Sequence, residues 1–179
     1  MIEFLSKEKY MSISMTTATV PVFRQMLGSL AAVLEKAEAH AQEHRIEPDA
    51  LLQARLYPDM FPLVRQVQIA TDFAKGATAR LAGVEVPSYD DNETSFSQLQ
   101  QRITKTLGFI DSVAPADIDA GQQRPITHGA GERARHFENG ERYLTRFALP
   151  NFYFHLTTAY AILRHNGVPI GKKDYIGSF

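Results

Sequence analysis

Histidine is the residue type in this chain best suited to bind a transition metal or to transfer a proton near neutral pH. The 179 residues include six histidines and no cysteine. The absence of cysteine excludes disulfides, cysteine-ligated zinc, iron–sulfur clusters and thiolate nucleophiles. Any metal or acid–base chemistry must therefore rest on histidine together with oxygen-bearing side chains.

His155 has the placement best suited to a site. It lies within an apolar stripe with the spacing of one helix face, formed by Leu149, Phe152, Leu156, Ala159 and Leu163. At ~100° per residue, His155 falls about 70° from the centre of this stripe, and Asn151 lies one turn earlier on the same flank. Both residues are expected at the edge of a helix seam, where a neighbouring helix can reach them.

A second helix offers a matching flank. Its apolar stripe runs from Leu63 to Leu81, and Gln66 lies about 70° from the stripe centre, with Asp59 two turns earlier on the same side. If the two helices face each other, Gln66, Asp59, Asn151 and His155 converge at one end of the fold. Two interpretations stay open: a buried polar network in which a neighbouring amide satisfies His155, or a metal or catalytic site.

The other histidines favour plainer interpretations. His40 and His44 have the i, i+4 spacing that can chelate a metal, but their polar flanks favour solvated histidines near the end of a helix. His128 and His136 lie among several arginines, which could bind an anion, yet glutamates dilute that charge and a solvated face is favoured. His165 is roughly 15 Å along the helix from His155 and cannot share a site with it.

Four long stripes with helix periodicity dominate the chain, over residues 20–41, 63–81, 96–110 and 149–163. Ser95 and Gln98 have capping-box spacing at the start of the third stripe. Short β-like runs flank Gly129-Ala130-Gly131, so residues 124–137 are predicted to form a small hairpin. The predicted fold is all-α, an antiparallel four-helix bundle with a β-hairpin in the connection before the last helix.

Length and charge narrow the class of protein further. The net charge of -1 gives no support to a nucleic-acid or membrane-surface protein. No run reaches the roughly 18–20 apolar residues of a spanning helix, and residues 1–10 lack the apolar core of a signal peptide. We expect a cytoplasmic protein with a disordered extension at residues 1–10 and one domain at residues 11–179.

Two long segments carry a family resemblance: ARLYPDMFPLVRQVQIATDFAKGATARLAGVEVP at residues 54–87 and FALPNFYFHLTTAYAILRHNGVPIGKKDY at residues 147–175. They resemble a bacterial domain-of-unknown-function family grouped with the DinB/YfiT-like superfamily of predicted metalloenzymes. The similarity begins near Met11 and covers essentially the rest of the chain. The resemblance implies a four-helix bundle of up-down-down-up type that is often dimeric.

The resemblance also implies a site. The superfamily typically holds nickel, zinc or iron through three histidines, one on the second helix and two at i, i+4 on the fourth. By register, His155 matches the second histidine of the fourth-helix pair, Asn151 stands where the first would be, and Gln66 falls where the second-helix histidine is expected. One histidine of three is thus retained, and Asp59 is the residue that could add charge.

Two functions follow from these observations. The first is a metal- or thiol-dependent transferase with a degenerate metal site at His155, Asn151, Gln66 and Asp59. The alternative is a non-catalytic homodimeric binding or structural protein whose polar site has lost its metal. A small-molecule ligand is compatible with both, and neither involves nucleic acid or a membrane.

Overall fold

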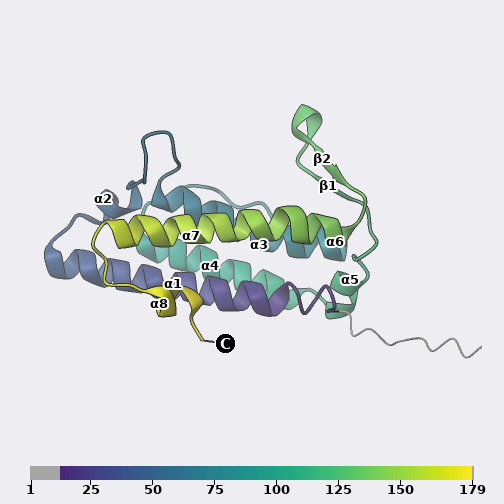
Figure 1. Ribbon diagram of the computed structural model, residues 1–179, viewed down its shortest axis with the longest axis horizontal. Helices are drawn as coiled ribbons and strands as arrows, with labels where there is room; N and C mark the ends of the chain where they lie inside the picture. Colours follow the sequence, from purple (N-terminus) through teal and green to yellow (C-terminus); the bar gives the residue numbers. More distant parts are fainter. Residues whose placement is uncertain (1–12, 179) are drawn as a thin grey trace, which may run out of the picture.

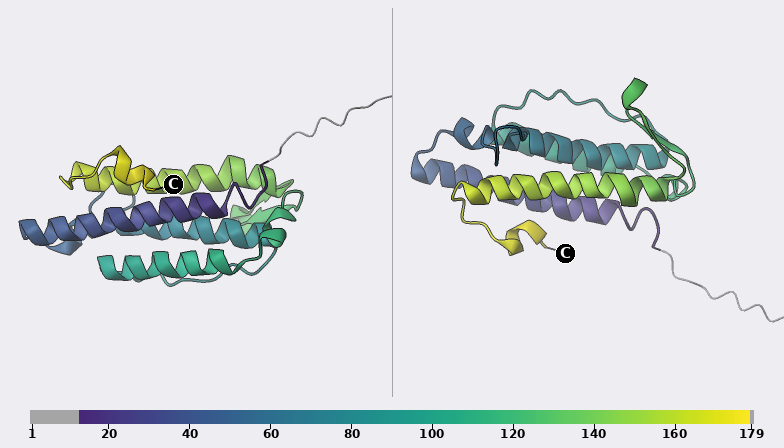
Figure 2. Two further views of the ribbon diagram at one scale, coloured as in Figure 1. Left: turned by 90° about the horizontal axis from the view of Figure 1, so that it is seen from below. Right: turned by 45° about the horizontal axis from the view of Figure 1, so that its top comes forward.

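Four long helices lie side by side along the length of the molecule (Figures 1 and 2). The computed structural model describes residues 13–178, so the predicted extension at residues 1–10 lies outside the described residues. The long helices are α1 (Val20–His44), α3 (Leu63–Ala82), α4 (Phe96–Ser112) and α7 (Leu149–His165). α3 packs against both α7 and α4, and α1 packs against α4 and α7. The predicted helical class is confirmed, and so is the small hairpin.

Local signals in the sequence fix where these helices begin and end. α1 ends at Arg45, which adopts the left-handed conformation with φ 55. α3 follows Pro62 and ends at Gly83, whose φ of 72 suits a glycine at a helix C-terminus. At the start of α4 the backbone N–H of Gln98 donates to the Ser95 hydroxyl at 3.2 Å, which is half of the predicted capping box, and the Gln98 side chain accepts from the Thr94 backbone instead of that of Ser95.

Short elements connect the long helices. They are α2 (Pro48–Leu52), α5 (Pro115–Asp119) and the 3₁₀ turn η1 (Gly131–Arg133), and a further short helix, α8 (Lys172–Ile176), follows the last long helix. An irregular connection, residues 83–95, links α3 to α4 by running along the outside of the molecule (Figure 2). The buried Arg102 of α4 holds this connection through Glu93 at 2.9 Å and Asp91 at 3.1 Å.

The hairpin consists of β1 (Ile126–His128) and β2 (Arg135–Phe137), paired antiparallel with Thr127 opposite His136. The chain then enters α6 (Gly140–Tyr143), capped by the Asn139 side chain, and continues through the π-helical turn η2 (Leu144–Ala148) into α7. The sequence predicted the last helix only from Leu149. The structure extends it because Pro150, which has no N–H to donate one turn back, is accommodated by the wider π turn.

The core lies between the long helices and includes the predicted apolar stripes together with residues of the connections, such as Leu52, Ile118 and Tyr143. Its largest fully buried side chains include Phe23, Phe96, Tyr143 and Phe152. Within residues 13–178, no helix combines the length and the apolar character that crossing a membrane requires.

Candidate functional site

His155 of α7 and Gln66 of α3 meet between the two helices. The His155 Nδ1 atom lies 2.7 Å from the Gln66 Oε1 atom, and this is a buried side-chain hydrogen bond. His155 is 8% exposed and Gln66 is 2% exposed. The structure therefore brings together the two residues that the flanking positions of the two stripes pointed to.

The Gln66 amide fixes the protonation of the His155 ring. Gln66 Nε2 donates to the Phe61 backbone carbonyl at 3.0 Å, which leaves Gln66 Oε1 facing His155 as an acceptor. His155 must then carry its proton on Nδ1, and Nε2 is left with a free lone pair. In the described part of the chain Nε2 has no hydrogen-bond partner, and it is not sealed from solvent.

Burial keeps this imidazole neutral. It lowers the pKa of His155 from 6.5 to about 4, with a further contribution from the nearby Arg65 guanidinium. Near pH 7 the ring is therefore an uncharged acceptor at Nε2 rather than a cation.

Asn151 and Asp59 do not join this pair. Asn151 is half-buried one turn before His155, and its Nδ2 atom donates to the Phe147 carbonyl at 2.7 Å. Asp59 is exposed in the turn that precedes α3. The prediction that Asp59 shares a helical face with Gln66 is wrong, because α3 begins only at Leu63 after the extended Pro62.

The side chains at His155 do not fit a resident transition-metal ion. Such sites take three or four strong donors, usually imidazoles or carboxylates, and residues 13–178 hold no group of three His, Cys, Asp or Glu side chains able to bind one. The Gln66 oxygen already accepts from His155 and its nitrogen donates to the Phe61 carbonyl. Of the four residues predicted as ligands, two carry only an amide and Asp59 is exposed in the turn before α3, so the donor chemistry favours another use of His155.

An aromatic cluster that the sequence did not reveal adjoins His155. Phe73 of α3 stacks on the His155 ring at a centroid distance of 6.1 Å and on the His128 ring at 5.7 Å. His128 comes from β1, and its edge contacts Phe147 at 4.8 Å. Docking of the hairpin on α3 and the η2 turn thus brings a second histidine close to the first.

His128 differs from its predicted state. A solvated face was expected for both hairpin histidines. This is confirmed for the exposed His136 but is wrong for the half-buried His128. Burial, together with the charges of Arg80 and Arg135, lowers the pKa of His128 from 6.5 to about 4. Its Nδ1 atom is buried without a hydrogen-bond partner in the described residues.

A groove runs beside Phe73, with a volume of about 440 Å³. We call it the Phe73 groove, and it is lined by Arg65, Ile69, Asp72, Phe73, Lys75, Arg80, Val86 and His128. The residues come from α3, from the 83–95 connection and from the hairpin. The one local signal near it in the sequence is a glycine inside the predicted helix, Gly76, one turn before Arg80.

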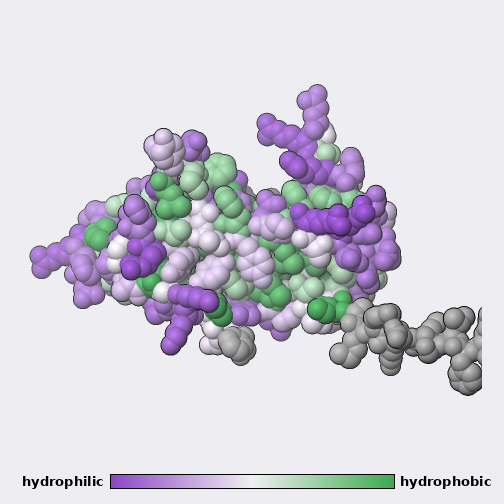
Figure 3. Space-filling model, viewed as in Figure 1, coloured by the Kyte–Doolittle hydropathy of each residue, from purple (hydrophilic) through white to green (hydrophobic). Residues whose placement is uncertain are grey.

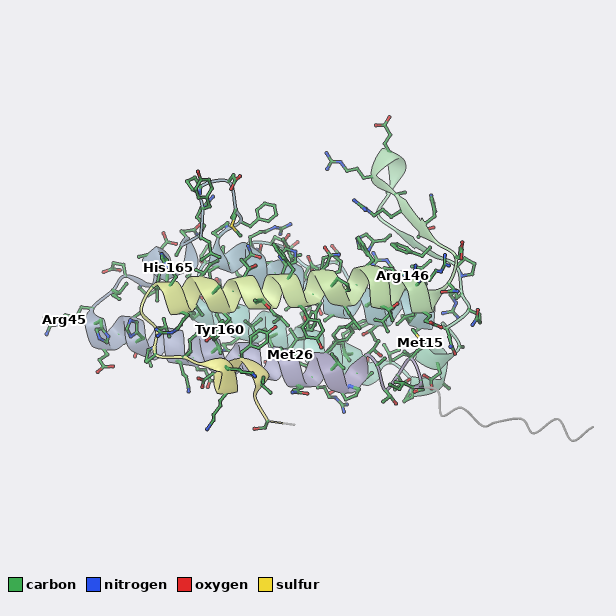
Figure 4. The ribbon with its side chains drawn as sticks, viewed as in Figure 1. Met15, Met26, Arg45, Arg146, Tyr160 and His165 are labelled. Carbon is green, nitrogen blue, oxygen red and sulfur yellow. The ribbon has the colours of Figure 1, made fainter. Side chains whose placement is uncertain are left out.

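The remaining histidines lie away from this region. Figure 4 places His165 at the opposite end of α7 from Arg146. His40 and His44 stack on each other at 4.1 Å near the end of α1, and His44 Nδ1 bonds the His40 carbonyl oxygen at 3.0 Å. None of these three rings contributes to the His155 site.

Comparison with known proteins identifies relatives of this fold. Residues 15–176 match the model of the family described as domain of unknown function DUF1993. A crystal structure of a DinB family member protein from Shewanella denitrificans is similar, with 42% sequence identity, a TM-score of 0.83 and 92% of each chain covered. No curated protein matches the chain. The family match spans most of the chain, and the chain therefore belongs to the DUF1993 family, with a structural relative of the DinB type.

Proposed function

We propose that this protein is a non-catalytic small-molecule-binding member of the DinB-like fold. The observation that carries the proposal is the chain of hydrogen bonds from Phe61 through Gln66 to His155. This chain orients a neutral imidazole whose Nε2 lone pair is free to accept a hydrogen bond from a ligand. A fixed acceptor beside an aromatic wall is typical of ligand sites, which combine apolar surface with a few oriented polar groups.

The protonation of His155 supports binding over catalysis. A general base works best when its pKa lies near the working pH, because it must be both deprotonated and basic. The pKa of His155 is lowered to about 4 by burial, so the ring is a weak base near pH 7. A weak base can still accept a hydrogen bond, and this requires no proton transfer.

The competing function is a metal- or thiol-dependent transferase, which the relationship to a DinB family member keeps in view. Metal analysis of protein purified without a His tag separates the two. We expect nickel, zinc and iron far below one equivalent, and a melting temperature that added divalent ions leave unchanged. One equivalent of metal in the natural chain that is lost in His155→Ala, but retained in His165→Ala, would overturn the binding proposal.

We also infer that the long helices follow the up-down-down-up order. The extended connection of residues 83–95 supports this inference, because it has the length to return the chain to the starting end of α3 before α4 begins. Helices that run in the same direction need such a connection, whereas antiparallel neighbours are joined by short loops.

Dimer formation is a further proposal, and an exposed apolar face supports it. Leu56, Tyr153 and Phe154 line one surface hollow, and Phe154 is 57% exposed. Tyr57 and Phe61, from the same turn as Leu56, are exposed as well. Hydrophobic side chains are visible on the surface around α7 and the turn beside it (Figure 3). Exposed apolar patches of this kind often mark contacts between proteins.

Light scattering at micromolar concentration tests the dimer. We expect twice the chain mass, and a monomer for the double variant Tyr153→Ser, Phe154→Ser. Val84 is 45% exposed in the 83–95 connection, so Val84→Ser serves as the matched control and should remain dimeric. A monomeric mass for the natural chain would refute this proposal and leave the binding proposal intact.

A further inference from the structure

The Phe73 groove has the dimensions and the mixed lining of a ligand site. Its volume of about 440 Å³ lies within the range of roughly 300–1,000 Å³ typical of small-molecule pockets. One wall is apolar, because Ile69, Phe73 and Val86 contribute carbon surface and the His128 ring lies parallel to Phe73 with an interplanar angle of 2°. A planar or apolar body fits such a wall.

The charged side chains of the groove differ in whether they already have a partner of opposite charge, and most of them do. Asp72 pairs with Arg102 at 2.7 Å and with Lys75 at 2.6 Å. Arg65 pairs with Asp91. Arg80 is the groove cation left without a carboxylate within 4.0 Å in the described part of the chain, and its Nη1 atom donates to the Tyr143 hydroxyl at 3.5 Å.

The position of the Arg80 guanidinium is built into α3. A Cβ atom at Gly76 would lie 2.5 Å from Arg80 Nη1, so the guanidinium occupies space that any other residue at position 76 would fill. Glycine inside a helix is less favourable than alanine. Gly76 is buried in the middle of α3, away from either cap, and its missing side chain leaves room for the Arg80 guanidinium against the helix.

The geometry points to the Phe73 groove as a binding site for a small organic carboxylate, with its anionic group on Arg80 and its planar or apolar body along Phe73 and His128. This inference rests on the proposed binding function and names a ligand class for the groove, which adjoins His155 through the Phe73 ring. Arginine recognises carboxylates through paired N–H donors in a planar fork. A carboxylate here would supply the partner that Arg80 lacks within the protein.

Titration with benzoate, followed by calorimetry and by NMR of the labelled protein, tests the inference. We expect saturable binding that shifts the Arg80 side-chain and His128 ring signals, with clearly weaker binding of the uncharged isostere benzamide. Arg80→Gln should weaken benzoate binding by about tenfold or more, because a charge-assisted bidentate contact is lost. Gly76→Ala should also weaken binding, because it displaces the guanidinium while keeping its charge and favouring the helix.

Arg164→Gln is the matched control, since Arg164 is exposed near the end of α7 and should leave benzoate affinity unchanged. Equal affinity for benzoate in Arg80→Gln and in the natural chain would overturn the inference, as would a lack of saturation at millimolar concentration. If benzoate shifts the His155 ring signals without those of the groove, the assignment of the ligand to the Phe73 groove fails while the proposed function stands. If neither benzoate nor a fragment mixture shifts any of these signals, both proposals fail.

Discussion

Moderate acidification should destabilise this protein through His155. Burial lowers the pKa of this ring from 6.5 to about 4, so between these values the unfolded chain binds a proton that the folded chain excludes. Above the pKa of His155 in the unfolded chain, the folded protein keeps its full free energy of unfolding. This free energy falls as the pH drops from the pKa of His155 in the unfolded chain towards its pKa in the folded chain.

The expected size follows from the same two values. A difference of 2.5 pKa units corresponds to a limit of about 3.4 kcal/mol, at ~1.4 kcal/mol per unit. Because His155 is only 8% exposed, solvent screening reduces this effect little. Integrated from about pH 7 to about pH 5, the loss is about 2 kcal/mol of the free energy of unfolding.

Urea unfolding of the natural chain and of His155→Gln over this pH range isolates the effect. Glutamine does not titrate, so the stability difference between the two proteins should shrink by about 2 kcal/mol between about pH 7 and about pH 5. His128 and the carboxylates titrate in both proteins and cancel in the comparison. A stability difference that does not change with pH would refute the claim that the folded protein excludes a proton from His155.

Three stability predictions test the elements around the site. Arg102→Met removes the cation that pairs with Asp72 and Glu93, and it should lower the free energy of unfolding by about 3 kcal/mol in urea. Arg24→Ala removes an exposed ion pair with Asp111 and should lower it by under ~1 kcal/mol. Gly140→Ala should destabilise the fold by more than ~2 kcal/mol, because its Cβ would collide with backbone, while Gly28→Ala meets open space and should raise stability. Ser95→Ala should cost about 1 kcal/mol and speed hydrogen exchange in the first turn of α4.

Periodicity alone predicted the helical part of the site. His155 and Gln66 stand at matching angles beside their apolar stripes, and helices that pack through those stripes must bring both flanks together. This reasoning uses only local spacing, which the sequence records directly. It failed for Asp59 because it extended a helical face past Pro62, where proline and the extended backbone before α3 end the repeat.

The groove could not be predicted in the same way. His128 becomes part of it only because the hairpin folds onto Phe73 and Phe147, and such contacts between distant segments leave no periodic trace. The π turn that leads into α7 was missed for a related reason, since the apolar stripe from which the last helix was predicted begins only at Leu149. Gly76 is the one residue near the groove that stands out in the sequence. Its role becomes visible only in the structure, where the Arg80 guanidinium lies against it.

The protonation state of the His155 ring tests the central claim most directly. NMR of protein with nitrogen-labelled histidine reports which ring nitrogen carries the proton and at which pH the ring titrates. The account predicts a neutral His155 protonated on Nδ1 near pH 7, with a pKa of about 4, and loss of this tautomer preference in Gln66→Leu. A ring protonated on Nε2, or a ring that titrates near its ordinary value of 6.5, would contradict it.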